Sequence, residues 1–482
     1  MEYQKSQKGG LFIGLTLFIG ILLMPLPAGL SVLGVKVLAV SVLMAVWWGT
    51  EAIPIPITSL LPLVLFPMLG IAGGRVDPKD GISTFTNYSH PLVMLALGVF
   101  LLAGAIVKWN LHKRIALTIV KCIGTKPSNL VLGFTLATGF VSMWMSNVTA
   151  VAMMLPVAVA LLIQANVKMN DPLGVCLGLA IPYAATIGGI ATVIGTGTNL
   201  AGVATISKLT GVTISFYEWM KVGMPFVLLT LPALWYYMVK ILKVDKSVTL
   251  DKQVLDNELK ALGPVSKAEK LVSTVFVVTV GLWMTRIFWG KQLPFIGDET
   301  ISTLAGIALF LIPVNFSKGE FLMDLKTGMA SISWGTMLLL GGAMTIGDAF
   351  AKAGITTWIA SGLSFLQGVP PVAVVIFFML FAALITEITT NMIVVVAFLP
   401  VAFGVAKSIG MPPLPVLMAV TVASSFAFMF PAATPTNAIA FGSGYFQVKD
   451  MIKYGFGAKL VCMVIFPVAF YFISVAILGI GK

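Results

Sequence analysis

Four short clusters of uncharged polar residues interrupt long apolar stretches of this chain. The clusters are Ser142, Ser146 and Asn147; Gly195, Thr196, Thr198 and Asn199; Thr386, Thr390 and Asn391; and Ala433, Thr434, Thr436 and Asn437. Amide and hydroxyl groups can donate hydrogen bonds to a carboxylate, and their oxygens can bind a hard cation. The clusters therefore predict reversible binding of a small anion and a cation inside an apolar environment.

Two of these clusters contain residues that break helices. Gly197 and Pro435 each lie inside an apolar stretch that is long enough to be one helix. Proline removes a backbone donor, and glycine permits non-helical dihedral angles. A helix broken at these points presents free N–H groups to an anion and free carbonyl groups to a cation.

A purely structural role is the alternative for these residues. Serine, threonine and asparagine inside membrane helices commonly join helices by hydrogen bonds. The repetition of the asparagines in register, beside helix breaks, favours a binding role. Glu51, Asp348 and Glu387 are further candidates because charged residues in or near membrane spans are often functional. The sequence leaves open whether Glu51 is a loop carboxylate, and whether Glu387 faces the site or pairs with a lysine.

The composition identifies the medium in which these residues lie. Of the 482 residues 58% are hydrophobic and 10% are charged, whereas soluble domains carry roughly 25% charged residues. Many apolar runs are long enough to cross a bilayer as a helix. We therefore expect an all-α polytopic membrane protein, and the composition excludes a soluble enzyme or a disordered chain.

Eleven apolar runs predict transmembrane helices. They are 11–28, 33–49, 54–71, 90–107, 172–206, 220–242, 271–289, 298–315, 333–351, 412–441 and 454–480. Two further runs, 128–164 and 370–407, are each about twice the length of one span and carry polar residues at the middle. We interpret these two as re-entrant hairpins, because irregular backbone at membrane depth must be enclosed by protein or line a cavity.

The basic residues predict the orientation of the chain. Segment 108–126 carries five basic residues and no acidic one, and 243–270 is the longest hydrophilic stretch. The positive-inside rule places both segments in the cytoplasm. We therefore expect a cytoplasmic (inner) membrane protein with a cytoplasmic N-terminus and an external C-terminus. The net charge of +12 is then explained by topology and contact with the lipid bilayer, and nucleic acid is not an expected partner.

The two halves of the chain resemble each other. The segment SNVTAVAMMLPVA (146–158) matches TNMIVVVAFLPVA (390–402), MLALGVFLLAGA (94–105) matches MLLLGGAMTIGD (337–348), and TGTN (196–199) matches TPTN (434–437). With the predicted topology the repeats are inverted, as in many secondary transporters. The expected organisation is a first helix in 1–32, a first repeat in 33–242, a cytoplasmic linker in 243–270 and a second repeat in 271–482. The first repeat contains hairpin 128–164 and broken helix 172–206, and the second contains hairpin 370–407 and broken helix 412–441.

Three segments carry a resemblance to a known family. They are TEAIPIPITSLLPLVLFPMLGI, SMWMSNVTAVAMMLPVA and PAATPTNAIAFGSGY. The chain resembles the divalent anion/sodium symporter family over nearly its whole length. The resemblance implies transport of dicarboxylates, citrate or sulfate by a homodimer. In each protomer, a transport domain with both hairpins and both broken helices would move like an elevator against a scaffold domain.

The resemblance also implies roles for individual residues. The expected substrate-binding residues are Ser146, Asn147, Val148, Thr196, Thr390, Asn391, Met392, Thr434 and Pro435. The implied sodium positions are Ser142, Ser146, Asn147 and Gly195 for one ion, and Thr386, Thr390, Asn391 and Ala433 for another. No catalytic residue and no cofactor is expected, apart from sodium as a possible coupling ion.

The hairpin tips depart from the family pattern of Ser-Asn-Thr. The triplets here are Ser146-Asn147-Val148 and Thr390-Asn391-Met392, so both closing threonines are lost. From these changes we expect an exchanger of C4 or C5 dicarboxylates such as succinate, malate or 2-oxoglutarate. The alternative is a sodium-coupled dicarboxylate symporter, and a sulfate or citrate carrier is a further one.

Other functional classes fit the residues poorly. A channel needs a continuous polar pore or filter, whereas paired hairpins of opposite orientation indicate alternating access. His90 and His112 are the only histidines, and Cys122, Cys176 and Cys462 are scattered. The chain therefore offers neither an obvious catalytic constellation nor a Cys/His metal motif.

Overall fold

The computed structural model describes all residues except 1–4, 73–81, 83, 245–251, 363–367 and 476–482. Part of the predicted linker 243–270 and the end of the predicted span 454–480 lie outside the described residues. The described part is helical except for loops and one short antiparallel pair, β1 (Pro313–Asn315) and β2 (Glu320–Phe321). The expectation of an all-helical membrane protein is therefore confirmed.

The chain divides into two compact units. Unit 1 comprises 1–94, 200–214 and 333–424, and unit 2 comprises 95–199, 215–332 and 425–482. Each unit contains pieces of both sequence halves, so the compact units do not coincide with the two predicted repeats, and the repeats stay a prediction. One predicted hairpin belongs to each unit.

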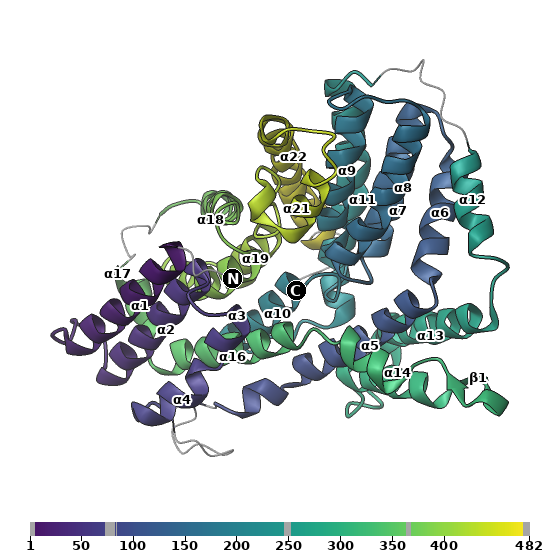
Figure 1. Ribbon diagram of the computed structural model, residues 1–482. Coiled ribbons are helices and arrows are strands. Elements are labelled where there is room, and N and C mark those ends of the chain that lie inside the picture. The colour runs from purple at the N-terminus through teal and green to yellow at the C-terminus, as the bar shows by residue number, and fades with distance from the viewer. Residues whose placement is uncertain (1–4, 73–81, 83, 245–251, 363–367, 476–482) are drawn as a thin grey trace. The chain divides into compact units, whose positions relative to one another are not determined.

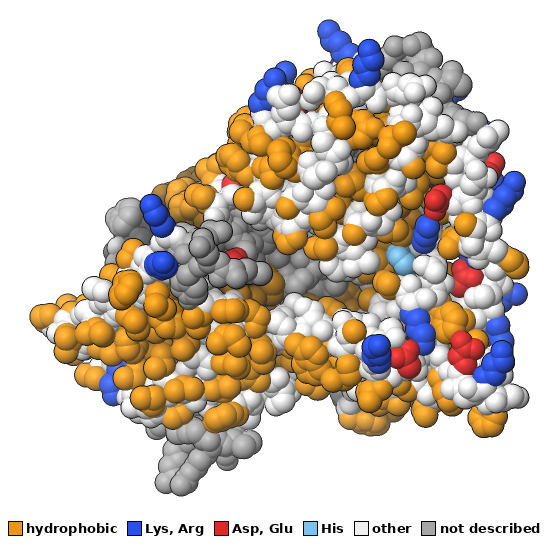
Figure 2. Space-filling model, viewed as in Figure 1, with side chains coloured by type: hydrophobic (Ala, Val, Ile, Leu, Met, Phe, Trp, Pro, Cys, Tyr) orange, Lys and Arg blue, Asp and Glu red, His pale blue; other side chains and the backbone are white. Residues whose placement is uncertain are grey.

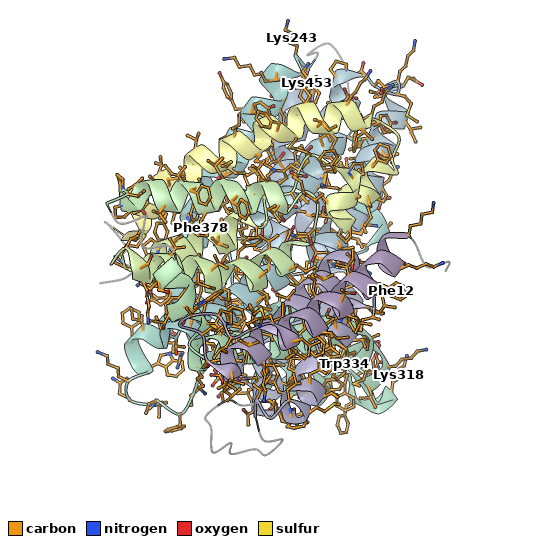
Figure 3. All side chains as sticks on the ribbon, turned by 90° about the vertical axis from the view of Figure 1, so that its left-hand side faces the viewer. Phe12, Lys243, Lys318, Trp334, Phe378 and Lys453 are labelled. Carbon is orange, nitrogen blue, oxygen red and sulfur yellow. The ribbon has the colours of Figure 1, made fainter. Side chains whose placement is uncertain are left out.

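Unit 1 contains the N-terminal helices, most of one half-helix from the middle of the chain, and a run of helices from the second half. The helices are α1 (Lys5–Leu23), α2 (Val32–Thr50), α3 (Ile55–Thr58), α4 (Leu61–Met68), α10 (Gly197–Thr210), α16 (Trp334–Lys352), α17 (Ile355–Gly362), α18 (Pro371–Ile385), α19 (Asn391–Ser408) and α20 (Pro413–Ala423). Helices α1 and α2 lie side by side (Figure 1), where Leu11 and Phe18 pack against Leu43 and Trp47. The opposite side of α1 carries exposed apolar side chains such as Phe12, which points away from the helix (Figure 3).

Unit 2 contains the remaining helices and the β pair. The helices are α5 (Pro91–Lys108), α6 (Leu111–Ile123), α7 (Pro127–Ser142), α8 (Asn147–Gln164), α9 (Pro172–Gly189), α11 (Phe216–Ile241), α12 (Gln253–Ala261), α13 (Lys267–Trp289), α14 (Asp298–Leu311), α15 (Leu325–Ser331), α21 (Pro435–Phe441) and α22 (Val448–Val468), the last followed by a π-helical turn (Ala469–Val475). Helix α9 is apolar on all sides, as expected of a helix in a core. Of its residues 94% are buried, and α7, α8 and α11 pack around it (Figure 1).

Among the described residues, eight helices are long and apolar enough to cross a bilayer, or nine if the bent pair α15–α16 is one span. Predicted spans 54–71, 298–315 and 412–441 fall on helices that are shorter than 18 residues. Prolines shorten two of them: Pro56, Pro62 and Pro67 lie in the α3–α4 segment, and Pro435 begins α21. The count of eleven spans therefore stays a prediction.

Local capping explains where several helices of unit 2 begin. The Ser215 hydroxyl oxygen accepts a hydrogen bond from Glu218 N at the start of α11. Ser266 and Glu269 form a reciprocal capping box at the start of α13. These caps fix the ends of two long apolar helices that the hydropathy pattern alone bounds only roughly.

Segments 108–126 and 243–270, which the positive-inside rule predicts to be on the same side of the membrane, are in contact. Helix α12, from the predicted linker, packs on α6, from segment 108–126. Their contact includes the ion pairs Lys113–Glu258 at 2.7 Å and Lys121–Asp256 at 2.6 Å. In Figure 2, charged side chains line this edge, whereas the face over α7, α8 and α11 is mostly hydrophobic. Both segments therefore lie on one side of unit 2, although which side of the membrane that is stays a prediction.

Candidate functional site

The first predicted hairpin turns at the predicted position. Helix α7 ends at Ser142 and α8 begins at Asn147, with a four-residue turn between them. The Ser142 hydroxyl donates a hydrogen bond of 2.6 Å to Asn147 Oδ1 across this turn. Ser142 is buried, Asn147 is half-buried and Ser146 is exposed. The turn thus holds one face of Asn147 against the protein and leaves the other accessible.

The first predicted broken helix is interrupted between α9 and α10. Helix α9 ends at Gly189, and α10 begins at Gly197. Asn199 Nδ2 donates to the carbonyl oxygens of Gly189, the last residue of α9, at 2.9 Å and of Thr192 at 2.7 Å. Its Oδ1 is buried and has no hydrogen-bond partner among the described residues. Asn199 therefore stabilises the break and retains a free acceptor oxygen.

The hairpin turn and the helix break touch each other within unit 2. Thr192 Oγ1 donates to the Met143 carbonyl oxygen at 2.6 Å. A Cβ atom at Gly189 would lie 2.4 Å from Asn147 Oδ1, and one at Gly188 would lie 2.1 Å from the Gly139 carbonyl oxygen. Only glycine permits this approach. The structure therefore brings Ser142 and Asn147 together with the break that contains Gly195.

The second predicted hairpin repeats the arrangement in unit 1. Helix α18 ends at Ile385 and α19 begins at Asn391. The Thr386 hydroxyl lies 2.6 Å from Asn391 Oδ1, as Ser142 does from Asn147 Oδ1, and also 2.6 Å from the Ser424 carbonyl oxygen. The two hairpin tips thus use the same five-residue spacing and the same bond.

The second break repeats the first. Between α20 and α21, Asn437 Nδ2 donates to the carbonyl oxygens of Ala427 and Phe430, each at 3.1 Å. These acceptors precede Asn437 by 10 and 7 residues, the same separations by which Gly189 and Thr192 precede Asn199. Asn437 Oδ1 is likewise buried without a hydrogen-bond partner in the described part of the chain. Thr434 caps α21 by accepting from Asn437 N at 3.2 Å.

The residues expected only as sodium ligands are more deeply buried than the residues expected to bind substrate. Among the proposed sodium positions, Ser142, Gly195, Thr386 and Ala433 are buried. Among the proposed substrate positions, Asn147, Val148, Thr196, Thr390, Asn391, Met392 and Thr434 are half-buried, and Ser146 and Pro435 are exposed. Thr386, Thr390 and Asn391 belong to unit 1, whereas Ala433, Thr434 and Pro435 belong to unit 2. All residues of the first predicted sodium site therefore belong to unit 2. The residues of the second predicted sodium site are divided between unit 1 and unit 2.

The four asparagines fall into two chemical classes. Asn147 and Asn391 engage their oxygen and make no hydrogen bond through Nδ2 among the described residues, so each can donate to an acceptor such as a carboxylate. Asn199 and Asn437 engage their nitrogen and leave a buried oxygen free, which is the atom that a hard cation prefers. The donor set suits a carboxylate, and the free oxygens suit a hard cation such as sodium.

Three charged candidates are also placed. Glu51 ends α2 with φ of 50° and is exposed, which supports the loop interpretation. Asp348 pairs with Lys352 at 2.9 Å in unit 1. Glu387 is buried next to Thr386.

Sequence reasoning missed several residues of this region. Gly188, Gly189, Thr192 and Ser424 were not predicted, although their backbone or hydroxyl groups hold the turn and the breaks. Paired glycines at the end of a buried apolar helix were a usable signal, because they permit close backbone approach. The Ser424 carbonyl has no sequence signal, since any residue supplies one.

Comparison with known proteins defines the family. The model for the sodium:sulfate symporter transmembrane region matches residues 5–478. The chain belongs to this family. It is therefore a membrane transporter and not an enzyme, and the predicted resemblance to the divalent anion/sodium symporters is confirmed.

Individual relatives of this symporter-family chain are named for dicarboxylates. The sodium-dependent dicarboxylate transporter SdcS of Staphylococcus saprophyticus is 36% identical over 99% of this chain and 93% of its own length. SdcS of Staphylococcus aureus strain USA300 has the same identity and coverage. Both names favour the sodium-coupled alternative over the exchanger.

Solved structures support the fold. The YdaH transporter of Alcanivorax borkumensis is 17% identical, with a TM-score of 0.56, over 83% of this chain and 88% of that one. MtrF of Neisseria gonorrhoeae is 12% identical, with a TM-score of 0.60, over 99% of this chain and 96% of that one. At these identities the likeness concerns the fold alone.

Proposed function

We propose that this protein is a sodium-dependent transporter of C4 and C5 dicarboxylates. The observation that carries the proposal is the division of the four asparagines. Among the described residues, Asn147 and Asn391 have free amide donors, and Asn199 and Asn437 have free buried oxygens. Within unit 2, the first turn and the first break bring both kinds of group together, which suits a carboxylate that arrives with a cation. The names of the full-length relatives at 36% identity support the same substrate and ion.

The proposed mechanism gives both hairpin tips the same role. At each tip the asparagine amide, together with backbone N–H groups at the start of the following helix, donates to a carboxylate. Sodium binds hydroxyl, amide and carbonyl oxygens deeper in each break. The bound cations offset the repulsion between the dianion and the exposed carbonyl groups, so ion and substrate bind cooperatively.

The architecture completes the proposal. We propose eleven spans, two re-entrant hairpins of inverted repeats, and an elevator-type movement in a homodimer of the cytoplasmic membrane. The matching bond patterns at the two tips and the two breaks support the repeat. The contact between α6 and α12 supports a common side for the two basic segments.

The test is uptake of labelled succinate into proteoliposomes. Vesicles are prepared empty or preloaded with unlabelled succinate, each with and without an inward sodium gradient. The proposal predicts concentrative uptake into empty vesicles that requires sodium and that excess malate or 2-oxoglutarate inhibits. Uptake only into preloaded vesicles, indifferent to sodium, would instead establish exchange. Inhibition by sulfate but not by malate would move the substrate to the inorganic anions.

A further inference from the structure

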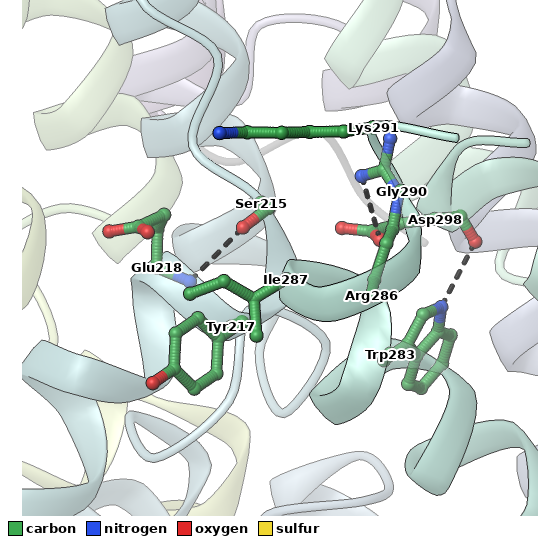
Figure 4. A pocket seen from close by; sticks show the side chains of 9 residues that line it. All are labelled: Ser215, Tyr217, Glu218, Trp283, Arg286, Ile287, Gly290, Lys291 and Asp298. Atoms are coloured by element: carbon green, nitrogen blue, oxygen red, sulfur yellow. Dashed lines mark hydrogen bonds and ion pairs between the residues drawn. The ribbon is translucent and has the colours of Figure 1, made fainter. Parts of the chain in front are cut away.

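A pocket lies where three helices of unit 2 meet at one end. The start of α11, the end of α13 and the start of α14 enclose a cavity of about 260 Å³. Figure 4 shows Tyr217 and Ile287 near one another, with the Lys291 side chain extended across the other side. Since α11 and α13 are both candidate membrane spans, the pocket opens near a membrane boundary.

The fixed charges of the pocket do not balance. Arg286 Nη1 pairs with Asp298 at 3.1 Å, and Glu218 pairs with Lys221 at 3.0 Å. Lys291 is exposed and has no ion pair or hydrogen bond within the described residues. The pocket and its immediate partners therefore carry a net charge of +1. Arg286 also retains Nη2, which makes no hydrogen bond in the described part of the chain.

Exposed apolar side chains belong to the pocket lining or lie close to it in the chain. Ile287, Phe288 and Phe295 expose 52%, 77% and 75% of their surface. Exposed side chains of this kind at the end of a spanning helix contact lipid in a membrane protein. A cationic pocket thus adjoins a surface suited to acyl chains.

We propose that this pocket binds the phosphodiester headgroup of an anionic phospholipid. One phosphodiester carries a single negative charge, which matches the uncompensated charge of the pocket. Lys291 Nζ and Arg286 Nη2 donate to the phosphate oxygens, and the acyl chains lie on Ile287 and Phe288. A zwitterionic lipid adds an ammonium group that Lys291 repels, so the site selects anionic lipid.

A chain of side-chain contacts connects the pocket to the first hairpin turn. Asp298 holds the Phe216 backbone N–H at 2.7 Å as well as Arg286. Phe216 stacks on Trp283 at 4.4 Å and on Trp144 at 6.3 Å between ring centroids. Trp144 lies in the turn that precedes Asn147. A headgroup that fixes Arg286 therefore also stabilises the aromatic stack behind this turn.

The experiment measures lipid retention by native mass spectrometry of the detergent-purified protein. Phosphatidylglycerol or phosphatidylcholine is titrated into the wild type, Lys291→Gln, Lys291→Arg and Lys318→Gln. Lys318 is the matched control, because it is an exposed lysine of the same unit in the turn of the β pair (Figure 3). One lysine near an anionic headgroup changes affinity by roughly fivefold. We expect at least that loss for phosphatidylglycerol in Lys291→Gln, and near wild-type binding in the other two variants.

Further arms separate the explanations. Equal losses in Lys291→Gln and Lys318→Gln would reduce the effect to general charge attraction and overturn the site. Displacement of the lipid by millimolar glycerol phosphate would assign the pocket to a soluble anion instead. Melting of each variant in lipid-free detergent checks the fold. The proposal also requires that phosphatidylglycerol raises the melting temperature of the wild type more than that of Lys291→Gln.

Discussion

Asn147 and Asn391 are oriented by a single neighbouring hydroxyl each, and this orientation gives them their chemistry. The hydroxyl groups of Ser142 and Thr386 lie 2.6 Å from the amide oxygens of Asn147 and Asn391. The amide nitrogens therefore remain available to donate to a bound anion. A hydrogen bond to a charged acceptor contributes roughly 1.5–3 kcal/mol. The two tips should therefore contribute comparably to the affinity for a dicarboxylate.

Replacing either asparagine by alanine tests this contribution. We expect Asn147→Ala and Asn391→Ala each to raise the half-saturating succinate concentration about 10- to 100-fold, through the loss of one charge-assisted bond. The measurement is initial uptake in proteoliposomes at saturating sodium. Asn257→Ala, on the exposed surface of α12, is the control and should leave uptake unchanged. An unaltered half-saturation in both tip variants would remove the asparagines from the site.

Substitutions of Asn199 and Asn437 test whether their free oxygens bind sodium. Sodium that binds only the folded protein raises its melting temperature by mass action. We expect this sodium-dependent rise in the wild type and a smaller rise in Asn199→Ala and Asn437→Ala, each measured against the same protein in choline chloride. Comparison within each variant cancels the intrinsic cost of losing the bonds to the backbone carbonyls. A full sodium response in both variants would assign their free oxygens a structural role only.

At the residue scale, the sequence singled out the tip asparagines and the hydroxyl groups that the structure places beside them, and their role in binding stays a prediction. The apolar surroundings and the repeated spacing were enough to single them out. It could not predict which amide atom each asparagine leaves free, because that depends on carbonyl groups such as Thr192 O that every residue type supplies. The free oxygen of Asn199 is a property of the folded helix break.

At the scale of elements, the contact between the first hairpin and the first break depends on two glycines. The carbonyl of Gly139, on α7, occupies the space that a side chain at Gly188, on α9, would need. We expect Gly188→Ala to lower stability by about 1–3 kcal/mol through overpacking and to reduce transport. Gly281, inside α13, has no atom within 4 Å of an added Cβ. Gly281→Ala should therefore be neutral or slightly stabilising in thermal melts, and equal losses in both variants would contradict the packing argument.

Two ion pairs of the amphipathic helix α6 should contribute unequally to the free energy of unfolding. Arg114 Nε lies 2.6 Å from Glu269, whose side chain is only 4% exposed, whereas Lys121 and Asp256 are 49% and 35% exposed. Removing one partner of a buried pair leaves an uncompensated charge and costs about 3 kcal/mol, whereas an exposed pair contributes under about 1 kcal/mol. Arg114→Ala should thus melt well below Lys121→Ala. Similar melting temperatures would indicate that water reaches Glu269.

Helix positions were easier to predict than helix lengths. The breaks at Gly197 and Pro435 follow from backbone chemistry and occur where expected. The prolines of the α3–α4 segment were visible in the sequence, yet hydropathy outweighed them in the assignment of a full span. The charged helix α12 carries no hydropathy signal and is stabilised by its partners on α6.

At the scale of the whole molecule, the units mix the two sequence halves. Unit 1 takes α10 from the first half and α16 to α20 from the second. A repeat in sequence indicates which segments are alike but not which copies pack together, because packing depends on surfaces that both copies share. The fold class was therefore predictable, whereas the partition of helices between units was not.

The native cysteines offer a direct test of orientation. Cys122, on α6, is exposed, and Cys176 and Cys462 are buried. If the basic segments are cytoplasmic, a membrane-impermeant maleimide should label inside-out vesicles and spare right-side-out ones. Cys122→Ser should abolish the labelling. Labelling from the external side alone would reverse the topology.

The hydroxyl of Thr386 carries one hydrogen but lies equally close to two acceptors, Asn391 Oδ1 and Ser424 O. Ser142, its counterpart in the first hairpin, has Asn147 as its one acceptor in the part of the chain that the structure describes. One proton cannot serve both partners fully at the same moment. Asn391 Oδ1 therefore shares its hydroxyl donor with the Ser424 carbonyl, whereas Asn147 Oδ1 shares its donor with no other acceptor among the described residues. Two copies of one motif thus hold their asparagine amides with unequal strength.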